Sequence, residues 1–109
     1  MKVDQGWLDA AIEASKDREP TGLHGSARLM LGKAELLTVQ IEDGRVVGPA
    51  AVVAECEVPF SPSQVEALAE GSLNLAVEYM RGDLKPTGST AAIVAVIDAL
   101  DALASVAND

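Results

Sequence analysis

The sequence predicts one α+β domain over residues 1–109, with a mostly antiparallel sheet of about five strands and helices packed on one face. Two observations predict this fold. In much of the first half, apolar and polar residues alternate as they do in half-buried strands, whereas the second half repeats its apolar residues every three or four positions, as helices do. The chain is also 49% apolar and 23% charged, which is typical of a globular domain rather than of a disordered chain.

The first element is a helix expected over residues 4–18. Asp4 is a suitable N-cap, and Trp7 belongs to the apolar side of the helix. Glu19-Pro20 ends the helix, because proline cannot continue it and disfavours helical geometry in the residue before it.

Alternating patterns over residues 27–31 and 37–42 predict two strands, and Asp43-Gly44 is a strong signal for a hairpin turn after them. A third strand is expected over residues 45–58, broken near Gly48. The side chains expected to point inward from its second part are those of Val52, Ala54, Cys56 and Val58. Together these strands predict an antiparallel meander with one face in water.

Ser61, Pro62 and Gln64 have the spacing of a capping box, which predicts a helix that begins there and ends at Gly71. A further helix is expected to end at Gly82, and a short strand should occupy residues 83–87.

The last element is a long apolar helix expected over residues 89–103. Asp98 and Asp101 should lie in solvent, on the side opposite its apolar stripe. The stripe consists of Ile93, Val96, Ile97, Leu100 and Leu103.

From Val52 to Leu103 the sequence resembles the sterol carrier protein type two family. The resemblance lies in the strand over residues 54–58, in the helix that ends in Ala69-Glu70-Gly71, and in the linked segment from Tyr79 to Gly88. It implies a five-stranded sheet with an apolar tunnel under its helices, which binds a sterol, a fatty acid or a fatty acyl-CoA without chemical change. Pro86 stands where that family usually has an apolar strand residue, so this strand should lie at a sheet edge or have its pairing interrupted at Pro86.

The predicted function is therefore binding or transfer of an apolar small molecule, with no cofactor and no metal. Adaptable aliphatic and methionine side chains would form the walls of the site. The expected lipid-binding residues are Trp7, Met30, Leu73, Val77, Met80, Ile93, Val96, Ile97 and Leu100. The alternative is an ordinary core without a cavity, in a structural or interaction module such as a homodimer that pairs through Ala95 and Ala102 of the last helix.

Charge and composition argue against several other classes of partner. A net charge of −9 disfavours nucleic acid and anionic membrane surfaces. Stable membrane insertion is not expected either, because Asp98 and Asp101 interrupt the most apolar segment. The single cysteine suits a reducing compartment, and the first residues do not have the pattern of a signal peptide, so we expect a cytoplasmic protein.

The sequence offers no catalytic constellation, and the chain is not expected to be an enzyme. His24 should be a surface loop residue without a triad, and Cys56 a small buried apolar residue rather than a nucleophile. One cysteine and one histidine do not make a zinc site by themselves.

Overall fold

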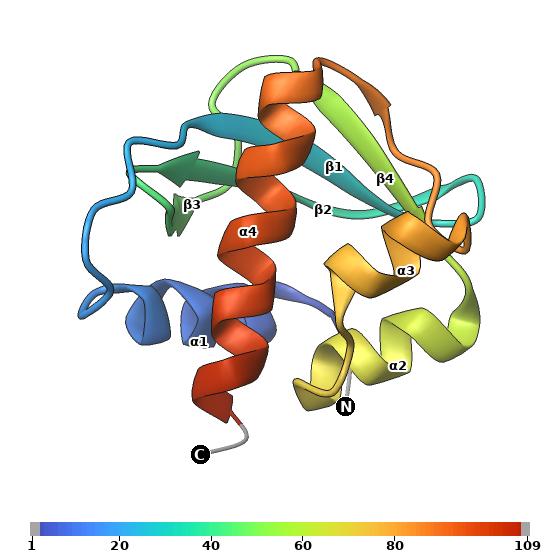
Figure 1. Ribbon diagram of the computed structural model, residues 1–109, viewed down its shortest axis with the longest axis horizontal. Coiled ribbons are helices and arrows are strands. Elements are labelled where there is room, and N and C mark those ends of the chain that lie inside the picture. The colour runs from blue at the N-terminus through green and yellow to red at the C-terminus, as the bar shows by residue number, and fades with distance from the viewer. Residues whose placement is uncertain (1–2, 108–109) are drawn as a thin grey trace.

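The computed structural model describes residues 3–107, with side chains described for residues 3–103. Figure 1 shows a five-stranded sheet behind a long helix, with three shorter helices around the lower part of that helix. In chain order the elements are α1 (Gln5–Ser15), β1 (Gly25–Leu31), β2 (Ala34–Glu42), β3 (Arg45–Gly48), β4 (Cys56–Phe60), α2 (Pro62–Glu70), α3 (Leu75–Arg81), β5 (Thr87–Gly88) and α4 (Thr90–Ala107).

The α+β class and the five strands are confirmed, but the simple meander is wrong. The strand order is β3-β2-β1-β4-β5, and β4 runs parallel to β1, while the other neighbouring pairs are antiparallel. A parallel pair cannot be joined by a tight hairpin, so the chain must leave the sheet after β3 and return beyond β1. β5 lies at the sheet edge, as predicted, but it consists of Thr87–Gly88 alone, so Pro86 and most of the strand predicted over residues 83–87 lie outside it.

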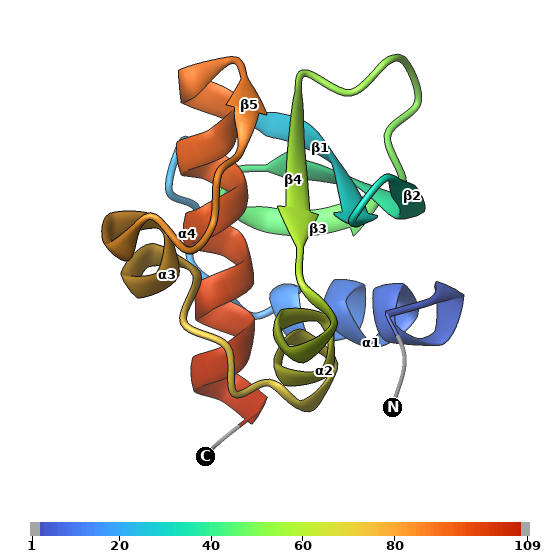
Figure 2. The same ribbon diagram turned by 90° about the vertical axis from the view of Figure 1, so that its right-hand side faces the viewer.

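The loop of residues 49–55 makes this crossing, and the prediction of a strand that resumes at residue 51 is wrong. It passes the sheet on the side opposite α4 (Figure 2). Two strand hydroxyls hold it, because Glu55 N donates to Ser26 Oγ at 3.0 Å and Ala50 N donates to Thr38 Oγ1 at 3.0 Å. Val52 is therefore 76% exposed rather than inward, and Val53 is 89% exposed.

The two faces of the sheet differ as the alternation predicts. One face carries buried aliphatic side chains, among them Leu29, Ile41 and Val58. On the other face Arg28 forms ion pairs with Glu35 at 2.9 Å and with Glu57 at 3.2 Å.

Local signals place the helix ends well. Gln64 N donates to Ser61 Oγ at 3.2 Å and Ser61 N donates to Gln64 Oε1 at 2.9 Å, which confirms the capping box of α2. Gly71 and Gly82 end α2 and α3 in the left-handed conformation. α1 is shorter than predicted, since it ends at Ser15 and the chain turns before Pro20.

Candidate functional site

The candidate site is the apolar layer under α4. The sheet provides one wall of this layer, and all four helices contribute apolar side chains to it. Of the predicted site residues, Leu73, Ile93, Val96, Ile97 and Leu100 are buried in this one cluster. Trp7 is partly buried and packs against it from α1.

Three predicted site residues do not line this layer. Met80 is 85% exposed and Val77 is 36% exposed, because α3 reaches the core through Leu75 and turns the side that carries both residues outward. Met30 is buried, but it follows the inward Leu29 in β1 and is paired with Pro59, so it lies on the opposite face of the sheet.

Sequence reasoning missed several residues that do line the layer. The largest fully buried side chains among these in the second half of the chain are Leu75 and Leu84. Asn74 was an available signal for Leu75, because asparagine is a preferred N-cap and its Oδ1 accepts a hydrogen bond from Val77 N at 3.2 Å. A helix that begins at Leu75 has Leu75 on its buried side and Val77 and Met80 on its outer side, as the structure shows.

α4 divides into two parts with different surroundings. The first turns of α4 lie against the strands, whereas its last turns lie beside the shorter helices (Figures 1 and 2). We call residues 90–96 the sheet half and residues 97–103 the helical half. In the sheet half, a Cβ added to Gly25 of β1 would stand 2.7 Å from Ala92 Cα. Only glycine permits the two backbones to approach this closely.

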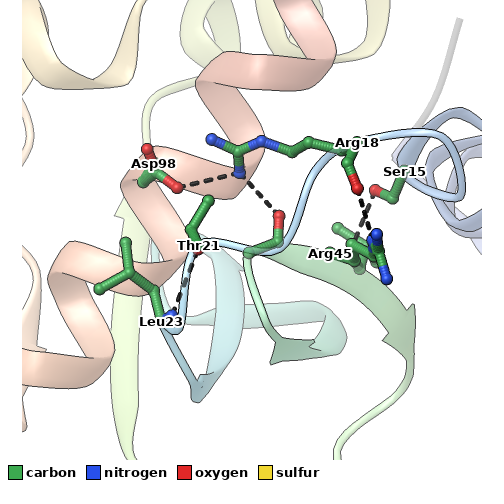
Figure 3. A network of polar contacts seen from close by, with 8 residues as sticks. Ser15, Arg18, Thr21, Leu23, Arg45 and Asp98 are labelled. Atoms are coloured by element: carbon green, nitrogen blue, oxygen red, sulfur yellow. Dashed lines mark hydrogen bonds and ion pairs between the residues drawn. The ribbon is translucent and has the colours of Figure 1, made fainter.

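Asp98 holds the helical half to α1 through Arg18, in a network drawn in Figure 3. Arg18 Nη1 lies 2.9 Å from Asp98 Oδ2 and donates to Gly44 O at 2.7 Å. Arg45 Nε donates to Arg18 O at 2.7 Å, and Val46 N donates to Ser15 Oγ at 3.1 Å. The end of α1, the β2–β3 hairpin and α4 are thus joined, and Asp98 is not the free surface residue that we predicted.

Asp101 holds the helical half to α3. Leu75 N donates to its Oδ1 at 2.7 Å and Ala76 N donates to its Oδ2 at 3.1 Å. A carboxylate at a helix N-terminus satisfies backbone donors that the helix leaves unpaired and is favoured by the helix dipole. The prediction of a solvated side chain is therefore wrong for Asp101 as well.

α2 is attached to the rest of the molecule differently. The backbone of α2 comes close to that of β4, the strand that it follows. Elsewhere it is joined through side chains, since Leu68 enters the core and Gln64 Nε2 donates to Asp83 O at 2.9 Å. An element held mainly by side chains can shift with less disruption than one in backbone contact with a sheet.

Cys56 and His24 are the two side chains that the sequence presents as candidates for chemistry. Burial, and to a smaller extent the charge of Glu55, raises the pKa of the Cys56 thiol to about 11, which disfavours the reactive thiolate. His24 is exposed in its loop, with Nε2 3.6 Å from Asp43 Oδ1. Within residues 3–103 no three His, Cys, Asp or Glu side chains lie close enough together to hold a metal ion. What the arrangement offers chemically is a large area of aliphatic surface.

Among the helices that the structure describes, none combines the length and apolarity needed to cross a bilayer. The predicted dimer contact also needs correction. Ala95 is fully buried on the inner side of α4, so it cannot meet a second copy. Ala102 is half-buried, and dimerisation itself stays a prediction.

Comparison with known proteins identifies the fold. No family model matches the chain, and a sequence search of curated proteins finds no match. Among solved structures, a crystal structure of sterol carrier protein 2 is similar with a TM-score of 0.67 at 19% identity, covering 98% of this chain and 97% of that one.

Two further structures are similar over most of their lengths. The sterol carrier protein domain 2 of Helicoverpa armigera has a TM-score of 0.60 at 16% identity, with 95% of this chain and 90% of that one covered. The palmitated SCP2L2 of Aedes aegypti has a TM-score of 0.53 at 14% identity, with 90% and 95% covered. The chain thus has the fold of sterol carrier protein 2, and the resemblance seen in the sequence is confirmed at that level.

Proposed function

We propose that this protein binds and carries an apolar small molecule, without chemical change, in the layer between the sheet and its helices. The observation that carries the proposal is the continuous aliphatic cluster to which all four helices and the sheet contribute. The fold supports it, because similar structures include sterol carrier proteins and one of these was solved in a palmitated form.

The proposed location of the protein is the cytoplasm, because a single buried cysteine suits a reducing compartment.

The helical half of α4 is the proposed place for the ligand. In the sheet half, room for a ligand would require the main chains at Gly25 and Ala92 to separate. The helical half contributes side chains such as Leu100 to the layer, and Trp7 and Leu103 are only partly buried. Outward movement of α2 would open this part of the layer while its hydrogen-bonded first turn stays at the end of β4.

The energetics favour a long chain or a ring system. Each buried methylene contributes about 0.8 kcal/mol, so a saturated chain of about twelve carbons contributes roughly 9 kcal/mol. That is comparable with the roughly 4–15 kcal/mol that association costs in lost translational and rotational freedom. We therefore expect useful affinity only for molecules of about this size or larger.

Native mass spectrometry of the purified protein tests the proposal. We expect an apolar molecule to co-purify or to bind after addition, and to be lost on denaturation. Ile97→Asp should abolish the bound mass, whereas Val47→Asp, at a half-exposed strand position outside the layer, should leave it unchanged. A protein that takes up no fatty acid, acyl-CoA, sterol or fatty alcohol would contradict the proposal.

The alternative function, an interaction module, is favoured by one observation. Val52 and Val53 expose apolar side chains in the loop of residues 49–55, and this loop lies on the side of the sheet away from α4 (Figure 2). Sedimentation would test a homodimer built on this loop. A dimer that the double change Val52→Asp and Val53→Asp converts to a monomer would support the alternative, and a monomer at every concentration would contradict it.

A further inference from the structure

We infer that the ligand of this layer is uncharged, such as a fatty alcohol, an ester or a sterol, and that fatty acid anions and acyl-CoA are disfavoured. This inference rests on the proposed function and narrows it to one chemical class. Three features of the described residues carry it: the buried polar groups, the helix N-termini and the charges of the helices.

The buried polar side chains are already engaged by the protein itself. Ser15 Oγ accepts from Val46 N and Ser26 Oγ accepts from Glu55 N, each in a bond of 3.1 Å or less. The amide of Gln64 completes the capping box and donates to Asp83 O. These three are the buried polar residues of the described chain, and none of them is a cation. A carboxylate within the layer would therefore lack a charged partner, which is costly in an apolar environment.

The helix N-termini, which are ready-made anion sites, are also occupied by the protein's own side chains. Asp4 Oδ1 accepts from Trp7 N at 3.1 Å at the start of α1, and Ser61 caps α2. Ser89 Oγ accepts from Ala92 N at 3.3 Å at the start of α4.

α3 is occupied twice, because Asn74 caps it and both oxygens of Asp101 accept from its first N–H groups. A negatively charged head group would have to displace one of these side chains, and at α1 or α3 that side chain is itself a carboxylate. At the start of each helix of the described chain, at least one backbone N–H group is already bonded to a side chain of the protein.

The charges of the helices repel an anion as well. The four helices carry seven Asp or Glu residues and a single basic residue, Arg81. Arg81 is exposed at the end of α3, between the acidic Glu78 and Asp83.

The two cations that follow the end of α1, Lys16 and Arg18, are already paired. Lys16 lies 2.8 Å from Glu13, and Arg18 is held by Asp98 and Gly44 O. A head group that emerges between the helices thus meets a surface of net negative charge, which favours a neutral molecule over an anion of the same length.

The experiment compares dodecan-1-ol with dodecanoate at pH 8, where dodecanoate is an anion. The two probes share the same alkyl chain, so their dissociation constants differ by the head group alone. The fluorescence of Trp7, the single tryptophan of the chain, reports binding because it packs against the layer. We expect dodecan-1-ol to bind at least about tenfold more tightly.

Each result decides between the two proposals. Equal or tighter binding of dodecanoate would overturn the inference and leave the proposed function standing. Binding of neither probe, together with no uptake of acyl-CoA or sterol, would contradict the proposed function and the inference with it.

A pair of charge variants gives an independent readout. Glu66→Lys with Glu70→Lys places two cations on α2, and we expect dodecanoate binding to gain at least about threefold relative to dodecan-1-ol. The matched control, Glu42→Lys with Glu55→Lys, makes the same change in net charge at exposed positions outside the helices. The same ratio of affinities in both variants would overturn the inference.

Discussion

The two halves of α4 show how one helix can be both fixed and adaptable. The sheet half touches β1 almost backbone to backbone, through Gly25 and Ala92. The helical half is surrounded by larger aliphatic side chains and is tied to its neighbours by two carboxylates, Asp98 and Asp101. Close contact between backbones leaves nothing that can rearrange, whereas contacts between long side chains can be exchanged for contacts with a ligand. This difference places the proposed binding function in the helical half.

The largest effect is expected from Ile97→Asp, at the start of the helical half. Ile97 is buried, and the substituted carboxylate would have no cation beside it in the apolar cluster. We expect the free energy of unfolding to fall by about 4 kcal/mol or more, as measured by urea denaturation. Ile97→Val is the control and should cost about 1 kcal/mol. A small effect of Ile97→Asp would show that this half of α4 is open to water.

The next largest effect is expected from Gly25→Ala, which tests the close approach of β1 to the sheet half of α4. Gly25→Ala puts a methyl group within 2.7 Å of Ala92 Cα, so α4 must move away from β1. We expect a loss of about 2–3 kcal/mol in the free energy of unfolding. The added change Ala92→Gly should not restore stability, because the nearest atom is a backbone Cα rather than the Ala92 side chain. Full rescue by Ala92→Gly would mean that only side chains meet at this point.

A smaller effect is expected where Asp101 holds α3. Asp101→Ala leaves Leu75 N and Ala76 N without their acceptor, and we expect a loss of about 2 kcal/mol in the free energy of unfolding. Asp101→Asn keeps one acceptor oxygen and should recover about half of that loss. Equal stability of all three proteins would show that Asp101 does not hold α3 in solution.

The smallest effect is a dependence on pH that comes from Cys56. Its folded-state pKa is raised to about 11 from an ordinary value of 9.0, so the folded state retains its proton longer than the unfolded state does. The stability linked to this thiol is fully present below pH 9 and is lost as the pH rises towards 11. Between pH 8 and pH 10 we expect a loss of about 1 kcal/mol. Cys56→Ala should lack this component, and identical pH profiles for the two proteins would contradict the burial of the thiol.

Signals that depend on neighbours in the sequence predicted much of this fold correctly. Three correct predictions each depended only on residues close together in the sequence. They are the capping box of Ser61 and Gln64, the end of α3 at Gly82 and the apolar stripe of α4. The buried part of the candidate site followed from that stripe. The edge position of the strand after Pro86 followed from the missing backbone donor.

The failures concern contacts between distant parts of the chain. Residues 51–55 were predicted to belong to a strand, but β4 begins at Cys56 and pairs in parallel with β1, and this pairing forces residues 49–55 into a crossing loop. Asp101 looked solvated because its partners, the N–H groups of Leu75 and Ala76, lie on another helix. Met80 has the composition of a pocket residue, and only the orientation of α3 shows that it points outward.

An NMR titration of the uniformly ¹⁵N-labelled protein with dodecan-1-ol would show whether the ligand binds at the helical half of α4. We predict that the amide resonances of residues 97–103, and those of α1 and α2 that face them, shift on binding. The resonances of Gly25 and Ala92 should change little. Absence of shifts, or shifts confined to the loop of residues 49–55 and the outer face of the sheet, would contradict the account.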